Sequence, residues 1–252
     1  MADETSRRRV TWRLRLALVV GLLVGVVALS ERFDGPVDRR SIWNAFGSAL
    51  SSARHDDGTA VAATDDGVVY LTFDDGPSLE WTRPILDVLD AHGVHAVFFP
   101  IGNQVSGGAE LLRSAVAAGH RVGNHTWDHD ELLGLDQAGF EATVGRTDVA
   151  IEAATGVTPR CLRPPGGRFD GTTVSEAAER GMSIEMWTID SRDWEVHDPD
   201  AIVEHVLSSV TDGSVILFHD GGGDRSATVA AVDRILDRLA DAGYAFDPLP
   251  RC

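Results

Sequence analysis

The feature that most constrains the fold is a regular alternation, from residue 67 onward, of short apolar runs with longer segments of helical periodicity. The apolar runs, which predict strands, are 68–73, 96–101, 121–124, 161–163, 183–189, 214–218 and a shorter one at 244–246. The segments with helical spacing are 81–91, 109–118, 137–155, 172–180, 199–210 and 227–242. Strands that alternate with helices form a parallel sheet covered by those helices, so the sequence predicts an α/β domain.

The turn directly after the first apolar run decides between two architectures. An open, doubly wound sheet that binds a dinucleotide needs a glycine-rich phosphate loop there. This chain has Asp74-Asp75-Gly76-Pro77 instead. The sequence therefore favours a (β/α) barrel of about seven strands, with its chemistry at the C-terminal strand ends.

The chain before residue 67 predicts export. Residues 1–30 place several arginines ahead of an apolar stretch, 16–29, which indicates a signal peptide or an N-terminal membrane anchor. Residues 31–66 are interpreted as a linker, and 67–252 as the catalytic domain. We expect an extracytoplasmic protein, held at the membrane if the segment stays uncleaved and otherwise secreted, and a monomer.

Composition supports a globular domain and excludes one class of partner. Hydrophobic residues make up 43% of the chain, enough for a sizeable core. The formal net charge is −17, whereas phosphate binding needs clustered Lys and Arg. No nucleic-acid partner is expected.

Polar residues gather where the first and third runs end. Asp74 and Asp75 close the first, and His125 and His129 follow the third. The i, i+4 spacing of the histidines predicts two rings on one side of a helical turn, within reach of one cation. Two histidines and one of the two aspartates would complete a three-ligand site, for which one divalent ion, expected to be Zn²⁺, is the natural occupant. The alternatives are a plain turn and a chance histidine pair.

Later strand ends carry further polar groups. Arg163 precedes Pro164-Pro165-Gly166-Gly167, Asp190 opens a loop that contains Asp193 and Trp194, and Leu217 precedes Phe218 and His219-Asp220. Each segment could be an ordinary polar or proline-fixed loop. Their coincidence at one rim favours a functional site.

Five of these segments, in order, resemble the motifs of the polysaccharide deacetylases, the NodB-like domains of carbohydrate esterase family four. The similar segments are Thr72-Phe73-Asp74-Asp75-Gly76, His125-Thr126-x-x-His129, Arg163-Pro164-Pro165-Gly166-Gly167, Asp190-x-x-Asp193-Trp194 and Leu217-x-His219. The resemblance covers residues 68 to about 250 and implies the distorted barrel of that family.

The resemblance also implies a role for each matched residue. Asp74 is the expected general base, Arg163 its ion-pair partner, and Asp75, His125 and His129 the ligands of the metal. His219 is the expected general acid, with Asp193 holding its imidazole in the charged form. The residues expected to line the substrate site are Trp194, Leu217, Pro165 and Gly166.

The implied reaction is metal-assisted hydrolysis of N-acetyl groups on a polysaccharide that contains N-acetylglucosamine, such as peptidoglycan or chitin oligomers, with release of acetate. One alternative is an esterase that removes O-acetyl groups from xylan-like chains. A second is a glycan-binding module without activity.

Two features of the chain modify this picture. Gly166 stands where the family usually has Tyr or Phe, so a ring of the substrate groove is missing while the backbone N–H that would stabilise the oxyanion is kept. The two cysteines, Cys161 and Cys252, suit an exported protein, and we expect them to form a disulfide. Two free thiols are the alternative.

Overall fold

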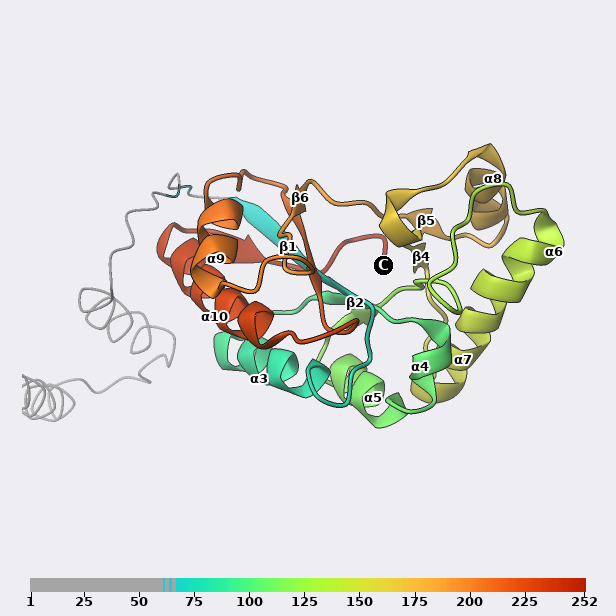
Figure 1. The fold of residues 1–252 in the computed structure, drawn as a ribbon, viewed down its shortest axis with the longest axis horizontal. Helices are drawn as coiled ribbons and strands as arrows, with labels where there is room; N and C mark the ends of the chain where they lie inside the picture. Colours follow the sequence, from blue (N-terminus) through green and yellow to red (C-terminus); the bar gives the residue numbers. More distant parts are fainter. Residues whose placement is uncertain (1–60, 62–63, 65–66) are drawn as a thin grey trace, which may run out of the picture. The chain divides into compact units, whose positions relative to one another are not determined.

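The structure is a computed structural model that describes residues 61, 64 and 67–252 (Figure 1). The predicted signal or anchor at 1–30, and all of the predicted linker except residues 61 and 64, lie outside the described residues. Its strands are β1 (Val68–Asp74), β2 (Val97–Phe99), β3 (Arg121–Val122), β4 (Cys161–Leu162), β5 (Ser183–Ile184), β6 (Ile189–Asp190), β7 (Val215–His219) and β8 (Ala245–Phe246). Its helices are α3 (Thr82–His92), α4 (Gly102–Val105), α5 (Ala109–Ala117), α6 (Gln137–Phe140), the π-helix η1 (Glu141–Gly145), α7 (Arg146–Thr155), the short 3₁₀ turn η2 (Pro165–Gly167), α8 (Gly171–Glu179), α9 (Pro199–Leu207) and α10 (Ser226–Asp241).

All strand pairs are parallel, as the alternation predicts. The larger sheet has the order β3-β2-β1-β7-β6, and β8 pairs with the first residues of β1. The smaller sheet is β4-β5, and a single bridge between Asn124 and Leu162 connects it to the end of β3. The α/β barrel expected from the sequence is confirmed, in a distorted form whose strands divide between two sheets (Figure 1).

Alternation along β1 separates the core from the site. Val69, Leu71 and Phe73 lie in the main apolar cluster, which also contains the buried residues of α3, α9 and α10. Successive side chains of a strand point to opposite faces, so Thr72 and Asp74 point to the other side. Asp74 is the last residue of this inward row, and the strand therefore ends with a buried carboxylate, 3% exposed.

Two predicted elements differ from the structure. The run 183–189 is not one strand, because it contributes β5 to the small sheet and β6 to the large one. The segment 137–155 is not one regular helix, because the π-helix η1 separates α6 from α7. Apolar content predicted both elements, but it carries no information on a change of sheet or on a widened turn. No helix among the described residues is long and apolar enough to cross a membrane.

The predicted disulfide is present. Cys161, at the start of β4, is bonded to Cys252 at the C-terminus, across a sequence separation of 91 residues. Cys161 packs inside the barrel beside Val97, Phe99 and Leu249. The bond thus fixes the end of the chain against the strand that leads to Arg163.

Candidate active site

A tight turn at the end of β1 presents the two adjacent carboxylates. Asp74 keeps strand geometry, whereas Asp75 has a left-handed backbone with φ of 71°. The turn is packed against the end of β7, because a Cβ atom on Gly76 would lie 2.1 Å from Oδ2 of Asp220. Only glycine fits there, and this close approach holds both carboxylates at the rim.

Arg163 is fully buried and binds Asp74 directly. Its Nη1 donates to Oδ1 of Asp74 at 3.0 Å and to Oγ1 of Thr72 at 2.7 Å. The guanidinium also donates to the backbone carbonyls of Glu185 and Met186, and it lies over the ring of Phe99 at 4.2 Å. The predicted arginine–carboxylate pair is therefore formed, and the rigid network fixes the orientation of the carboxylate.

Asp75, His125 and His129 converge on one point. Their potential ligand atoms all lie within 4.8 Å of one another. Oδ1 of Asp75 is 3.4 Å from Nε2 of His125 and 3.5 Å from Nε2 of His129. Two donors bonded at about 2.1 Å to one tetrahedral zinc ion are about 3.4 Å apart, so these separations fit a shared cation.

The partners of these three groups fit a metal as well. Nδ1 of His125 lies 2.7 Å from the backbone carbonyl of Arg163, and since a carbonyl only accepts, Nδ1 carries the proton. Nε2 is thus left with its lone pair toward the cluster, the usual arrangement for a ligating histidine. Oδ1 of Asp75 is buried and accepts no hydrogen bond from the described residues, as expected of an oxygen that serves as a metal ligand.

Charge reinforces this arrangement. Burial by itself would raise the pKa of the Asp75 carboxyl, but the close contact with the His125 ring and the charges of His125, His219 and His129 lower it to about 2. Burial would lower the pKa of His125, yet the carboxylates of Asp74 and Asp75 raise it. The cluster therefore attracts positive charge, which a proton or a metal ion can supply.

The histidine loop is not the helical turn that the spacing predicted. Residues 125–129 form a bent loop in which Thr126 and His129 have φ values of 65° and 60°. The rings still meet, with centroids 5.1 Å apart. The two rings that the i, i+4 spacing was expected to bring together do lie close to each other, but a bent loop and not a helical turn places them there.

The π-helix η1 holds this loop through a residue that the sequence analysis missed. The buried Asn124 donates to the carbonyl of Val144 in η1 at 2.9 Å and to Asp148 at 2.7 Å, and its oxygen accepts from the backbone N–H of Thr126 at 2.8 Å. Thr143 of η1 accepts a hydrogen bond from the N–H of Trp127. π-Helical turns often occur at functional sites, and this one contacts Asn124 and Trp127, at the start of the histidine loop and within it.

The predicted His219–Asp193 pair is formed at the end of β7. Nδ1 of His219 is 2.7 Å from Oδ1 of Asp193, and the His219 backbone N–H donates to Oδ2 at 2.9 Å. Thr228 also donates to Oδ2, at 2.8 Å. Burial would lower the pKa of His219, but the hydrogen bond and charge of Asp193, together with the negative charges of Asp74 and Asp75, raise it. The same pairing outweighs burial and lowers the pKa of Asp193.

Two more buried groups support this end of the site. Arg225, which no motif indicated, donates to the carbonyls of Gly221 and Asp193 at 2.7 and 3.0 Å. Asp220 accepts from Thr82 at 2.5 Å, and burial together with the nearby charges of Asp75 and Asp74 raises its pKa to about 7. Arg225 comes after a run of glycines, which resembles an ordinary loop; only the fold shows that it closes back onto Asp193.

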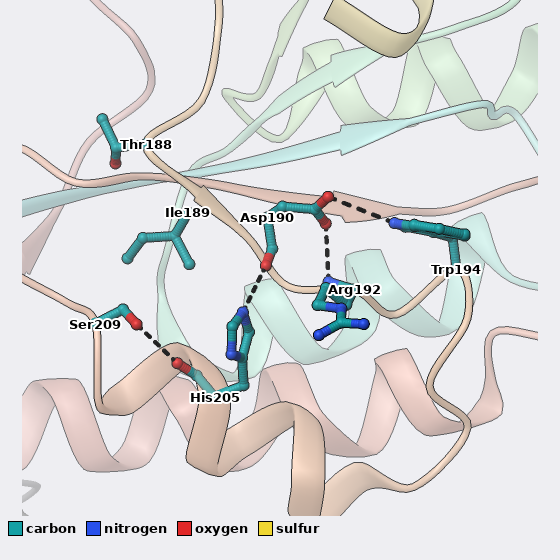
Figure 2. Close-up of a pocket in the computed structure, with 7 residues that line it drawn as sticks. All are labelled: Thr188, Ile189, Asp190, Arg192, Trp194, His205 and Ser209. Carbon is teal, nitrogen blue, oxygen red and sulfur yellow. Dashed lines mark hydrogen bonds between the residues drawn. The ribbon is translucent and has the colours of Figure 1, made fainter.

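The residues predicted to line the substrate site occupy different environments. Leu217 and Pro165 are buried, Gly166 is exposed, and the Trp194 side chain is 51% exposed. Gly166 has φ of 59°, and a Cβ there would meet only Arg168, at 3.9 Å, so the space beside Gly166 is open. Trp194 borders a surface cavity (Figure 2). The lining roles of these four residues remain predictions.

A carboxylate held by a buried arginine, a cation-attracting cluster and an imidazole with raised pKa share one barrel rim, and this combination defines a hydrolase of the metal-dependent class. A family model described as polysaccharide deacetylase matches residues 62–184. The chitooligosaccharide deacetylase of Sinorhizobium fredii is 39% identical over 194 residues, which cover 73% of this chain and 90% of that protein. The chain belongs to the polysaccharide deacetylase family.

Comparison with solved structures gives the same family. A peptidoglycan N-acetylglucosamine deacetylase superposes with a TM-score of 0.71 at 33% identity, covering 75% of this chain and 90% of that one. A family 4 carbohydrate esterase from Streptomyces lividans, in complex with acetate, gives 0.67 at 38% identity, covering 73% and 93%. These relatives share both the fold and a substantial part of the sequence.

Proposed function

We propose that this protein removes N-acetyl groups from N-acetylglucosamine units of a polysaccharide, with one divalent cation held by Asp75, His125 and His129. The observation that carries the proposal is the register of β1 and β7, which places Asp74 directly beside His219. A base and an acid are thereby fixed on adjacent strands next to the cation-attracting cluster. Zn²⁺ is the expected ion because the donors are two imidazoles and one carboxylate.

The cation, when bound, would polarise the acetamide carbonyl and promote ionisation of water. The residues of the chain then move the protons. Asp74, whose Oδ1 is occupied by Arg163, takes a proton from the attacking water at Oδ2, which lies 3.7 Å from Nε2 of His125. Arg163 cannot deprotonate, so it keeps Asp74 oriented without competing for that proton.

His219 acts at the other end of the reaction. The pKa of His219 is raised, chiefly by Asp193, which extends the pH range over which its imidazole is protonated. Asp193 engages Nδ1, so Nε2 is the atom that can donate. Donation to the amide nitrogen lets the C–N bond break and releases acetate and a free sugar amine. Asp193 accepts no proton in this scheme; it orients the ring and stabilises its charge.

The substrate is proposed to be a chitin-like or peptidoglycan glycan, by analogy with the relatives named above. Such polymers lie outside the cytoplasm, so the same analogy supports extracytoplasmic action. The open position at Gly166 supports a groove that admits a chain more freely than one closed by a ring.

Acetate release tests the proposal. Wild type and Asp74→Asn should be incubated with N-acetylglucosamine oligomers, peptidoglycan and O-acetylated xylan, with and without a chelator. We expect release from the N-acetylated substrates that a chelator abolishes and that falls about 100- to 10,000-fold in Asp74→Asn. Release only from xylan would indicate the esterase, and sugar binding without any release would indicate a non-catalytic module.

A further inference from the structure

Strained backbone marks the site, and it also marks one residue that the mechanism does not use. In the described part of the chain, four residues other than glycine have a left-handed backbone: Asp75, Thr126, His129 and Arg192. The first three present or separate the metal-binding side chains. Such strain persists where a particular side chain is needed at that place, because glycine would adopt the same φ without penalty.

Arg192, with φ of 60°, lies in the loop after β6, directly before Asp193. Its backbone N–H donates to Oδ1 of Asp190 at 2.8 Å, and the Trp194 indole nitrogen donates to Oδ2 of the same carboxylate at 3.5 Å. Asp190 therefore holds the backbone of Arg192 and the indole of Trp194, while Asp193, which lies between them in the sequence, pairs with His219. Figure 2 shows the carboxylate between the two groups.

These side chains border a cavity of about 280 Å³ (Figure 2). Its remaining walls come from the edge strand β6 and from α9, and the full lining is Thr188, Ile189, Asp190, Arg192, Trp194, His205 and Ser209. The cavity has the size of the smaller sites that proteins use for small molecules. The cavity lies beside the loop that contains Asp193, and its lining includes none of the proposed metal-binding residues.

The chemistry of the walls suits an uncharged sugar. The half-exposed indole of Trp194 offers an apolar face with a fixed orientation, on which the C–H face of a pyranose can pack. Nε2 of His205 donates to the Asp190 carbonyl at 3.0 Å, which leaves Nδ1 of the neutral ring as an acceptor for a hydroxyl. The ion pair of Arg192 with Glu195 engages Nε, which leaves further donors of the guanidinium available.

The same contacts disfavour an anion. The carboxylates of Glu195 and Asp190 lie next to Arg192 and offset its charge. A carboxylate or phosphate ligand would meet two like charges for one opposite charge. A polyhydroxylated neutral ring meets only dipoles and an aromatic face.

We propose that this cavity is a subsite for a second sugar unit of the glycan, separate from the unit that loses its acetyl group. The inference rests on the proposed function and extends it to chain length. The enzyme should prefer oligomers long enough to reach both places, because the loop from Asp190 to Trp194 joins the subsite to the acid.

Steady-state kinetics on N-acetylglucosamine dimer and hexamer test this preference with Arg192→Gly, which keeps the left-handed backbone and removes the side chain. We expect kcat/KM for the hexamer to fall about five-fold relative to that for the dimer, mainly through KM, as for the loss of one or two hydrogen bonds. His205→Ala should act in the same direction. Arg83→Ala, which removes an exposed arginine of α3, should leave the ratio unchanged. An equal loss on both substrates would overturn the proposal.

Binding to the Asp74→Asn variant tests the subsite without turnover. Adding chitin hexamer should shift the NMR resonance of the Trp194 indole N–H, and Arg192→Gly in the same background should weaken that response about five-fold. A Trp194 resonance that does not move at saturating hexamer would rule the subsite out, whatever the activity. Failure of all oligomers to release acetate, with the Trp194 shift retained, would instead reject the proposed reaction.

Discussion

Asp74 and His219 are direct partners in the parallel pairing of β1 and β7, and the backbone N–H of Asp220 donates to the Asp74 carbonyl at 3.0 Å just beyond them. Neighbouring strands lie about 4.8 Å apart, so the sheet itself sets the spacing between the two side chains that are proposed to move protons. Loops contribute the proposed metal ligands and the partners of the proposed acid, but the distance from proposed base to proposed acid does not depend on a loop.

The pairing of Asp193 with His219 should set the alkaline limb of the pH profile. His219 must be protonated to act as an acid, and Asp193 raises its pKa. Replacing Asp193 with Asn should therefore move the alkaline limb of kcat down by about 1 to 2 pH units, and lower the maximum about 100-fold or more. Asp233 pairs with His92 at the surface, and Asp233→Asn, the matched control, should leave the pH profile unchanged. An unmoved alkaline limb in Asp193→Asn would contradict the assignment.

The same pair has a signature in stability. The folded pKa of His219 is above its ordinary value of 6.5, so its contribution is fully present below pH 6.5 and is lost as pH rises through the folded pKa. The folded pKa of Asp193 is below 3.8, so its contribution is lost on acidification. Chemical denaturation of the metal-free wild type should show stability falling above neutral pH, and Asp193→Asn should flatten that dependence. A pH-independent difference between the two proteins would exclude the linkage.

His129 should be needed for the metal but not for the fold. It is about half exposed and contacts the cluster only through its ring, so His129→Ala removes a ligand without opening a cavity in the core. We expect Zn²⁺ affinity to fall by more than about 100-fold, since losing even an outer partner of a ligand costs 10- to 100-fold. Titration with a chromophoric chelator measures this. His197→Ala, an exposed histidine elsewhere, is the matched control. Unchanged affinity would exclude His129 as a ligand.

Asn124 should act on the metal through the loop that it holds. Asn124→Ala leaves the N–H of Thr126 and the carbonyl of Val144 without this partner. We expect the free energy of unfolding to fall by about 1 to 3 kcal/mol, and metal affinity to fall about 10- to 100-fold. Ile151→Ala, in the buried face of α7, should lower stability at least as much while leaving metal affinity unchanged. Equal effects of both variants on affinity would show that Asn124 acts only through stability.

The disulfide should stabilise the domain without taking part in catalysis. Replacing both Cys161 and Cys252 with serine releases a loop of 91 residues. In the chain-entropy model, this should lower the free energy of unfolding by about 4 kcal/mol. Urea denaturation measures the loss, and the reduced wild type should behave like the double variant. A double variant as stable as the oxidised protein would disprove the role.

The features that could be predicted from the sequence are those that depend on residues close together in the chain. The apolar runs and the segments of helical spacing between them indicated the α/β barrel, because strand and helix periods are properties of neighbouring residues. The proposed site residues could be named because each lies at or near the C-terminal end of a strand, and parallel strands bring these ends to one edge.

The features that escaped prediction depend on contacts between distant residues. Asn124 is distinctive only because η1 widens at Val144 and leaves a carbonyl to bind, and Arg225 only because its loop returns to Asp193. The division of 183–189 between two sheets also escaped, since an apolar run does not reveal which partner each residue pairs with. The left-handed backbone of His129 replaced the expected helical turn because the loop is fixed by η1 rather than by its own propensity.

Arg163 has one more consequence. From β4 it reaches Thr72 and Asp74 on β1 and the carbonyls of Glu185 and Met186, which lie between the small sheet and the large one. The side chain that orients the proposed base thus also connects the two sheets of the distorted barrel. A homologue without catalytic activity would no longer need Asp74. It would still need Arg163, because this side chain connects the small sheet to the large one.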